Sequence, residues 1–262
     1  MTQLSPESQL SSEYYTQAHF HTHGFCVLPS WLNASALLDI RTVAMSELEH
    51  AKKPWELEAE VGYPFAPKNL LATGGDTPRR LLQAYSRSPV FQRFAQDVRI
   101  KRLMQQLLPA QQVMMAQTHH NCIMTKLPQF SSDTDWHQDY RYWSFSSPNL
   151  ITAWLALGDE NAENGGLRVI PGSHRLALNA EQFDEKKFFK TETPENKKLL
   201  SNAINITLKP GDLLCFHANL LHAATRNNTS KPKVALVFSY HDATNLATPN
   251  TRSSSRPSIK LP

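Results

Sequence analysis

Apolar positions change their spacing about halfway along the chain of 262 residues. Within residues 33–53 they recur every three or four positions, which predicts an amphipathic helix capped by Asn33 or Ser35. Residues 79–108 predict two more helical pieces divided at a proline, and residues 12–24 a short helix. The first part of the chain is therefore expected to be mostly helical.

From residue 111 onward the apolar runs are short and are separated by turn-forming residues, a pattern typical of antiparallel strands. The strand-like runs are QVMMAQTHHNCIMTKLP, LITAWLALGD, GGLRVIPGSH, INITLKPGDLLCFH and PKVALVFSYHD. Helices followed by strands predict a mainly β fold with helices (α+β), a double-stranded β-helix or cupin-like jelly roll buttressed by N-terminal helices. The expected single domain comprises a helical part (1–110), a jelly-roll core (111–245) with a helical insertion (179–200), and a mobile tail (246–262).

The bulk composition argues against several classes of protein. The 27 basic residues outnumber the 23 acidic ones, but they are scattered, and no block of like charge marks a nucleic-acid-binding face. No apolar run reaches the roughly 18 residues of a membrane span, and the polar N-terminus lacks the order of a signal peptide, so the expected location is cytoplasmic. Cys26, Cys122 and Cys215 stand in apolar runs and are expected to be buried thiols.

The stretch TDWHQDYRYW, residues 134–143, contains the first candidate metal ligands. Alternate residues of a strand share a face, so His137 and Asp139 are expected to project together. An imidazole and a carboxylate are two members of the 2-His-1-carboxylate triad, which holds non-haem Fe(II) and leaves positions open for other ligands. The third ligand is expected from a histidine on a later strand, and His217 and His222 are both available.

Taken in order, these motifs resemble one known family. The H-x-D pair, the stretch TAWLALGDENAENGGLRVIPGSHR and the stretch GDLLCFHANLLHAATRNNTSKPKVAL are similar to the phytanoyl-CoA dioxygenase family of Fe(II)/2-oxoglutarate oxygenases. The similarity runs from about residue 13 to about residue 244. It implies Fe(II), 2-oxoglutarate and O₂ as cofactor and co-substrates. It also implies His137, Asp139 and His222 as the catalytic metal ligands, with His217 as a neighbour that is not a ligand.

The resemblance further implies residues for the co-substrate. Lys233 matches a position where the family usually has an arginine that binds the far carboxylate of 2-oxoglutarate. A lysine offers a point charge in place of a bidentate fork. Trp154 matches a tryptophan of the co-substrate pocket, Thr244 a hydroxyl near the same carboxylate, and Lys126 a polar position that points into the barrel. For these three, core packing, a strand end and the protein surface are the plainer alternatives.

Polar and aromatic residues near these motifs are candidates for contact with the substrate. Some stand beside the H-x-D pair and others in the turn GGLRVIPGSHR. One comes from the adjacent pair His119 and His120, of which only one is expected to point inward on a strand. The candidates are Tyr140, Tyr142, His120, Ser173, His174 and Arg175.

Together these features predict a hydroxylase that oxidises an aliphatic C–H bond and releases succinate and CO₂. The expected substrate is a small or lipid-linked anion, such as the acidic sugar of a lipopolysaccharide core, and peripheral contact with a membrane would suit a lipid-linked one. Two alternatives stay open: a metalloenzyme on the same barrel that does not use 2-oxoglutarate, and a catalytically silent relative that binds a ligand. The sequence does not indicate an oligomeric state.

Overall fold

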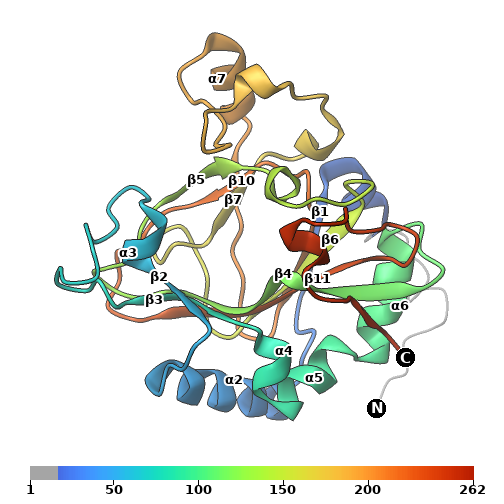
Figure 1. Cartoon of the computed structure of the whole chain (residues 1–262), viewed down its shortest axis with the longest axis horizontal. Helices are drawn as coiled ribbons and strands as arrows, with labels where there is room; N and C mark the ends of the chain where they lie inside the picture. Colours follow the sequence, from blue (N-terminus) through green and yellow to red (C-terminus); the bar gives the residue numbers. More distant parts are fainter. Residues whose placement is uncertain (1–16) are drawn as a thin grey trace.

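Two antiparallel sheets enclose the interior of the protein, whose computed structural model describes residues 17–262 (Figure 1). The larger sheet consists of β1 (Phe25–Leu28), β2 (Trp55–Leu57), β3 (Pro78–Leu82), β4 (Val113–Lys126), β6 (Leu150–Ala156), β9 (Leu213–His217), β11 (Lys233–Asp242) and β12 (Ile259–Lys260). The smaller one consists of β5 (Thr134–His137), β7 (Leu167–Val169), β8 (Ile204–Asn205) and β10 (His222–Ala224). Their orders are β1-β9-β6-β11-β4-β3-β2, with β12 beside β4, and β5-β10-β7-β8. The predicted jelly roll is confirmed.

Helices cover the outer face of the larger sheet (Figure 1). They are α2 (Ala34–Glu49), α4 (Ala84–Arg87), α5 (Pro89–Ala95) and α6 (Val98–Leu107), while α3 (Glu58–Val61) lies at the edge near β2 and α7 (Pro194–Leu200) in the smaller sheet's long connection. The predicted cap of α2 is Asn33, whose side chain accepts a hydrogen bond from the Ala36 N–H at 2.9 Å. The helix predicted from Ser12 is helical over residues 17–23, and its start lies outside the described residues.

The prediction of two helical pieces in residues 79–108 is wrong in one respect, because the segment begins as strand β3. Leu81 packs against the helices and Leu82 against the interior, so consecutive apolar residues serve opposite faces of a sheet. A second break at Asp97, whose side chain accepts from the Arg99 N–H at 2.8 Å, separates α5 from α6.

Strand alternation in β11 positions one functional residue. Leu236 and Phe238 join the cluster beneath the helices, whereas Ala235 and Val237 belong to the cluster between the sheets. Lys233 precedes Ala235 by two residues and therefore faces the interior.

Two segments differ from their predictions. The insertion at 179–200 contains one turn of 3-10 helix and the short α7 rather than a continuous helix. The tail at 246–262, expected to be mobile, is packed: β12 pairs with β4, and Leu261 is fully buried in the cluster beneath the helices. Among the described helices, none combines the length and apolar character needed to cross a bilayer.

Candidate active site

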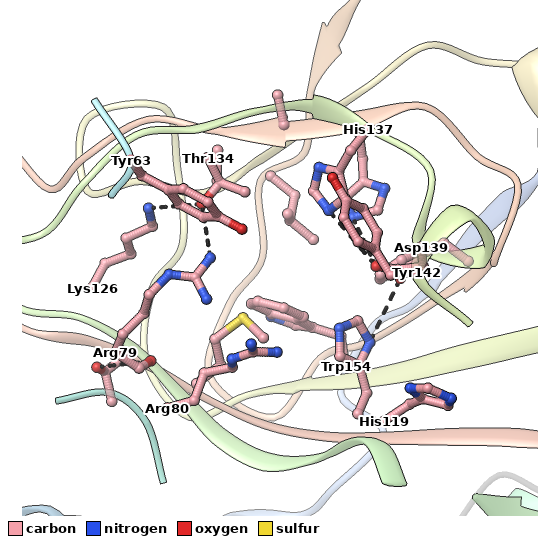
Figure 2. A pocket seen from close by; sticks show the side chains of 18 of the residues that line it. Tyr63, Arg79, Arg80, His119, Lys126, Thr134, His137, Asp139, Tyr142 and Trp154 are labelled. Atoms are coloured by element: carbon pink, nitrogen blue, oxygen red, sulfur yellow. Dashed lines mark hydrogen bonds and ion pairs between the residues drawn. The ribbon is translucent and has the colours of Figure 1, made fainter. Parts of the chain in front are cut away.

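Three metal-binding side chains meet where β5 and β10 pair (Figure 2). The register places His222 opposite His137, with ring centroids 4.2 Å apart. Asp139 follows as the first residue of a 3-10 turn, Asp139–Tyr142, and not on the strand itself. Its Oδ1 lies 3.7 Å from Nε2 of His137 and 3.8 Å from Nε2 of His222. The turn thus directs the carboxylate toward both rings.

Backbone carbonyls orient the two imidazoles. Nδ1 of His137 lies 2.8 Å from the carbonyl oxygen of Asp135, and Nδ1 of His222 lies 2.9 Å from that of Leu220. A carbonyl oxygen can only accept, so each Nδ1 carries the proton. Burial lowers the pKa of His222 to about 4, which keeps the ring neutral at pH 7. Each Nε2 therefore presents a lone pair toward Asp139, as in histidines that bind a metal.

The carboxylate of Asp139 completes a set suited to a divalent cation. Its Oδ2 is buried and has no hydrogen-bond partner among the described residues, while Nδ1 of His120 lies 3.6 Å away. Burial alone would raise the pKa of Asp139, but the surrounding His120, His222 and His137 hold it well below its usual range. A buried, ionised oxygen without a partner, beside two imidazoles whose Nδ1 atoms are held by carbonyl oxygens, fits a bound metal. Within residues 17–262, no other cluster of three such ligands occurs.

The metal-binding groups open into a cavity of about 250 Å³ (Figure 2). Its aromatic lining includes Tyr63, Tyr142, Trp143 and Trp154. Asp139 is the one carboxylate in the lining as described, whereas five arginine and lysine side chains line it. This excess of positive charge favours anionic ligands. These basic residues are Arg79, Arg80, Lys126, Lys233 and Arg252.

Lys126 and Lys233 form the first basic group, as direct cross-strand partners of β4 and β11. Like charges in this arrangement repel, and a carboxylate offsets the repulsion. Nζ of Lys233 lies 3.4 Å from Oε2 of Glu160, and both side chains are only 1% exposed. Trp154 joins the pair, because its Nε1 donates to Oε1 of Glu160 at 2.9 Å and its ring centroid lies 4.7 Å from Nζ of Lys233.

Lys126 is held by neutral oxygens. Its Nζ donates to the carbonyl of Ser132 and lies 3.4 Å from Oγ1 of Thr134. The backbone at Gly165 packs closely against the aliphatic part of the Lys126 side chain, because a Cβ at that position would lie 3.2 Å from Cγ of Lys126. The φ of Gly165 is +81°, a conformation that suits glycine. Burial, and then the charge of Arg79, lowers the pKa of Lys126 to about 7.

Arg79 and Arg80 are neighbours on β3 and share one carboxylate, Glu56 of β2. Nη1 of Arg79 donates to Glu56 at 2.6 Å, and Arg80 donates to it through Nε at 2.8 Å and through Nη2. Burial would raise the pKa of Glu56, but Arg80 and Arg79 lower it to about 2. Arg79 also donates to Oγ1 of Thr134 at 3.1 Å and stacks on Tyr63 (Figure 2). Two guanidiniums on one carboxylate leave a positive charge uncompensated.

The structure places several predicted residues in the cavity wall. Among the co-substrate candidates these are Lys233, Trp154 and Lys126, and among the substrate candidates Tyr142 and His120. Lys231, two residues before Lys233, is exposed and does not line the cavity.

Thr244 does not reach the co-substrate region, so that prediction is wrong. Its hydroxyl donates to Oδ1 of Asp242 at 2.5 Å, just beyond the end of β11. Lys233 begins the same strand, and nine residue steps along a strand span about 30 Å. The two residues therefore lie at opposite ends of the molecule's longest interior strand pair.

The substrate candidates Tyr140, Ser173, His174 and Arg175 also lie outside the cavity lining. The Tyr140 hydroxyl donates to a backbone carbonyl at 2.8 Å, and the Ser173 hydroxyl accepts from a backbone N–H at 2.9 Å. The turn that carries residues 173–175 packs against the end of the helix at residues 17–23, where the Gly172 N–H donates to the carbonyl of His23 at 2.8 Å. These contacts leave residues 173–175 outside the cavity lining.

Both histidines of the adjacent pair line the cavity, although alternation predicts only one. The register of β4 against β11 jumps from Asn121 to Ala116, so residues 117–120 bulge out of the ladder. Within a bulge the two-residue alternation no longer holds. His120 lies beside Asp139, and His119 stacks on Trp143 with ring centroids 4.8 Å apart.

Sequence reasoning missed most of the charged wall. Arg79 and Arg80 stand in a segment predicted to be helical, and Arg252 stands in the tail predicted to be mobile. Glu160 offered a weak signal, because it follows Trp154 by six residues. No spacing in the sequence connects these residues with the metal ligands.

Fold and site together define a jelly-roll metalloprotein with a 2-His-1-carboxylate centre. Residues 20–235 match the model of the phytanoyl-CoA dioxygenase (PhyH) family. The chain belongs to that family, as the motifs predicted.

Curated relatives with sequence similarity carry two kinds of name. Ectoine dioxygenase of Bordetella parapertussis is 25% identical over 193 residues, which cover 67% of this chain and 61% of that protein. Phytanoyl-CoA dioxygenase 1 of Oryza sativa subsp. japonica is 26% identical over 148 residues, which cover 56% of this chain and 51% of that protein. The chain thus spans between half and two thirds of the length of these relatives.

Solved structures share the fold at lower identity. EctD from S. alaskensis with 2-oxoglutarate and 5-hydroxyectoine superposes with a TM-score of 0.75 at 20% identity, covering 98% of this chain and 85% of that one. SnoN, a non-haem α-ketoglutarate-dependent epimerase from nogalamycin biosynthesis, has a TM-score of 0.73 at 22% identity, covering 92% and 87%. A fold common to a dioxygenase and an epimerase does not by itself specify the reaction.

Proposed function

We propose that the protein is an Fe(II)- and 2-oxoglutarate-dependent dioxygenase that hydroxylates an aliphatic carbon of a small anionic substrate. The observation that carries the proposal is the cluster of His137, Asp139 and His222 at the wall of a cavity lined by basic residues. Bound iron would supply the oxidative chemistry, in which O₂ and 2-oxoglutarate are consumed, succinate and CO₂ are released, and the substrate gains a hydroxyl group.

The protein's own contribution is to hold the reactants and keep water away. Three protein ligands leave the remaining metal positions open to small molecules. Trp143 and Trp154 are 8% and 3% exposed and contribute apolar surface to the wall of the cavity. Such walls limit access of bulk water, which would otherwise permit turnover without substrate.

Lys233 and Lys126 are the proposed anchors for the far carboxylate of 2-oxoglutarate. Both face the interior from paired positions on β11 and β4, and the hydroxyl of Thr134 lies beside Lys126. Two lysines can supply the charge that one arginine supplies elsewhere in the family, although without a bidentate fork. Glu160 holds Lys233 in place and would share its charge with the co-substrate.

Anaerobic titration of the Fe(II)-loaded protein with 2-oxoglutarate tests this proposal. Chelation of the metal should give a visible charge-transfer band, and its dependence on concentration gives the Kd. We expect the Kd to rise about tenfold or more in Lys233→Ala, because a charge-assisted bond is lost. Lys231→Ala is the matched control, since Lys231 is exposed and only two residues away. Absence of the band from the wild-type protein would contradict the proposal.

The ion pair between Lys233 and Glu160 favours a second candidate function, a metalloenzyme that does not use 2-oxoglutarate. In that case the lysine is already neutralised by a carboxylate at 3.4 Å and serves the fold. Iron would still bind, but 2-oxoglutarate would change neither the spectrum nor the rate of O₂ uptake. The titration therefore separates the two candidates.

The proposed substrate is a carboxylated or phosphorylated small molecule, free or lipid-linked, with a sugar acid as the first candidate. Support comes from the five basic side chains in the cavity lining. Succinate release should be screened over pools of sugar acids, acyl-CoA thioesters and amino-acid-derived solutes. Turnover confined to uncharged substrates would contradict an anionic class. The cytoplasmic location remains a prediction, which cell fractionation can test.

A further inference from the structure

We propose a second anion-binding site in the cavity, formed by Arg80, His119 and Arg252, which holds a carboxylate or phosphate group of the substrate. Figure 2 shows His119 on the opposite side of the cavity from Lys126, and Arg252 lines the same cavity. The inference rests on the proposed function, because it assigns one basic group of the cavity to the co-substrate and the other to the substrate.

Arg80 extends a fixed charge into the cavity. Strand alternation puts it on the same face of β3 as Leu82, which packs in the interior cluster, and its register partner is Met124 of β4. Nε and Nη2 are both committed to Glu56, whereas Nη1 has no hydrogen-bond partner among the described residues. The side chain keeps 19% of its surface accessible, and it lines the cavity (Figure 2). The free edge is therefore available to a ligand.

Arg252 brings a second guanidinium from the C-terminal segment. Its turn is anchored through Ser253, whose carbonyl accepts from Oγ1 of Thr118 at 3.2 Å and whose hydroxyl accepts from the Ser144 N–H at 2.8 Å. The Arg252 side chain lines the cavity but makes no ion pair or hydrogen bond with any residue in the described part of the chain. An arginine held at a cavity wall without an acidic partner is suited to binding an anion.

His119 lines the cavity together with the two arginines. Its Nε2 lies 2.7 Å from the Ser253 hydroxyl, and its ring stacks on Trp143. Burial, then the charge of Arg252, and to a smaller extent that of Arg80, lower the pKa of His119 to about 3. Both guanidiniums and the His119 ring line the same cavity, so a single ligand group there can be reached from all three side chains.

The balance of charge leaves room for a second anion. Five basic side chains line the cavity, and four carboxylates accompany them: Asp139 in the wall, with Glu56, Glu58 and Glu160 behind it. A divalent metal and the dianionic co-substrate would cancel each other. One positive charge then remains in excess, and of the three arginines in the lining Arg252 is the one without a carboxylate partner among the described residues. A substrate monoanion would neutralise it.

The test is calorimetric titration of the full-length protein, loaded with Fe(II) and saturated with 2-oxoglutarate under argon, with inorganic phosphate and with acetate. We expect saturable binding of at least one anion to the wild type, and a Kd about tenfold higher in Arg252→Gln and in Arg80→Gln. Arg252→Lys should recover part of the affinity. Arg256→Gln is the matched control, because Arg256 is an exposed arginine of the same segment that does not line this cavity.

The outcomes separate the two proposals. Binding of phosphate alone or acetate alone supports the site and identifies the group that it takes. Binding of neither anion, or equal losses in Arg252→Gln and Arg256→Gln, overturns it. If Arg80→Gln does not fold, as judged by circular dichroism, the Arg252 variants decide. The 2-oxoglutarate absorption band is recorded in the same samples. If the band is absent but anion binding depends on Arg252, the proposed function is wrong and the anion site is supported. If the band is present but no anion binding depends on Arg252, the proposed function is supported and the anion site is wrong.

Discussion

The two basic groups of the cavity are built differently. Lys126 and Lys233 are at most 4% exposed and are held by protein oxygens, with Glu160 paired to Lys233. Arg80 keeps one edge of its guanidinium free, and Arg252 has no acidic partner among the described residues. Buried lysines shift their pKa readily, whereas arginine stays charged. The lysine group is therefore coupled to folding and to pH, while the arginine group offers a constant charge to a ligand.

Loss of a metal ligand should give the largest effect, because the proposed chemistry at either basic group requires the bound metal. We expect His222→Ala to weaken Fe(II) binding by more than about 100-fold, since a bond to the metal is lost and Asp139 faces a gap. Calorimetry or the metal retained after dialysis measures this change. His217→Ala is the control, and an equal loss in that variant would contradict the assignment of His222.

Glu160→Gln tests the coupling of the lysine group to folding. Lys233 would keep a buried charge without a counter-charge, so the free energy of unfolding should fall by about 3 kcal/mol, as measured by urea denaturation. Glutamine keeps the acceptor for Nε1 of Trp154. The double variant Glu160→Gln/Lys233→Met should recover most of the loss. On the arginine side, Arg252→Gln should change stability by less than about 0.5 kcal/mol, because that residue is exposed.

The pH dependence of ligand binding should also distinguish the two groups. Burial, and then the charge of Arg79, lower the pKa of Lys126 to about 7. The other charged groups that influence this pKa are Glu58, Lys233 and Asp133. Between pH 7 and 8 its charged fraction falls about fivefold, and the affinity for 2-oxoglutarate should fall with it. Lys126→Met should flatten this dependence. Binding of acetate, monoanionic over this interval, should stay nearly constant, because guanidiniums remain charged.

The same lysine should make stability depend on pH. Its folded pKa lies below the unfolded value of about 10.4, so the unfolded state binds more protons between pH 7 and 10.4. The cost of burying it is fully present below pH 7 and disappears as the pH rises through this window. The wild type should therefore gain stability relative to Lys126→Met from pH 7 to 9 in urea titrations. A parallel course of the two proteins would contradict the lowered pKa.

Removal of the Ser253 hydroxyl should have a smaller effect on the arginine group. The variant Ser253→Ala loses the bonds to the Ser144 N–H and to His119, and we expect unfolding to become about 1 kcal/mol easier. Anion binding should weaken only slightly, because the Thr118 hydroxyl still donates to the carbonyl of Ser253 and holds the turn. Ser254→Ala, at an exposed neighbour, should change stability less.

The smallest effect is expected at Thr244. Because it lies at the other end of β11 from Lys233, Thr244→Ala should change the Kd for 2-oxoglutarate by less than about twofold. A large increase in that Kd would place the co-substrate elsewhere and would break the comparison between the two basic groups.

The metal centre could be predicted from the sequence because it depends on short-range regularities. Asp139 follows His137 by two positions, and His222 opens a short strand that pairs with β5. The 3-10 turn changed the local geometry of Asp139 without removing it from the site. The alternation of apolar residues after position 111 likewise determined the jelly roll, since each strand must bury one face.

Only the tertiary structure decided which charges face the metal. The bulge at residues 117–120 turned His119 inward, the strand pairing of β3 delivered Arg80, and burial of Leu261 fixed the segment that carries Arg252. Periodicity along a chain records which side chains share a face, but it does not record which faces meet. That choice depends on sheet order, bulges and the packing of distant segments, so the ligand-binding wall appears only once the chain is folded.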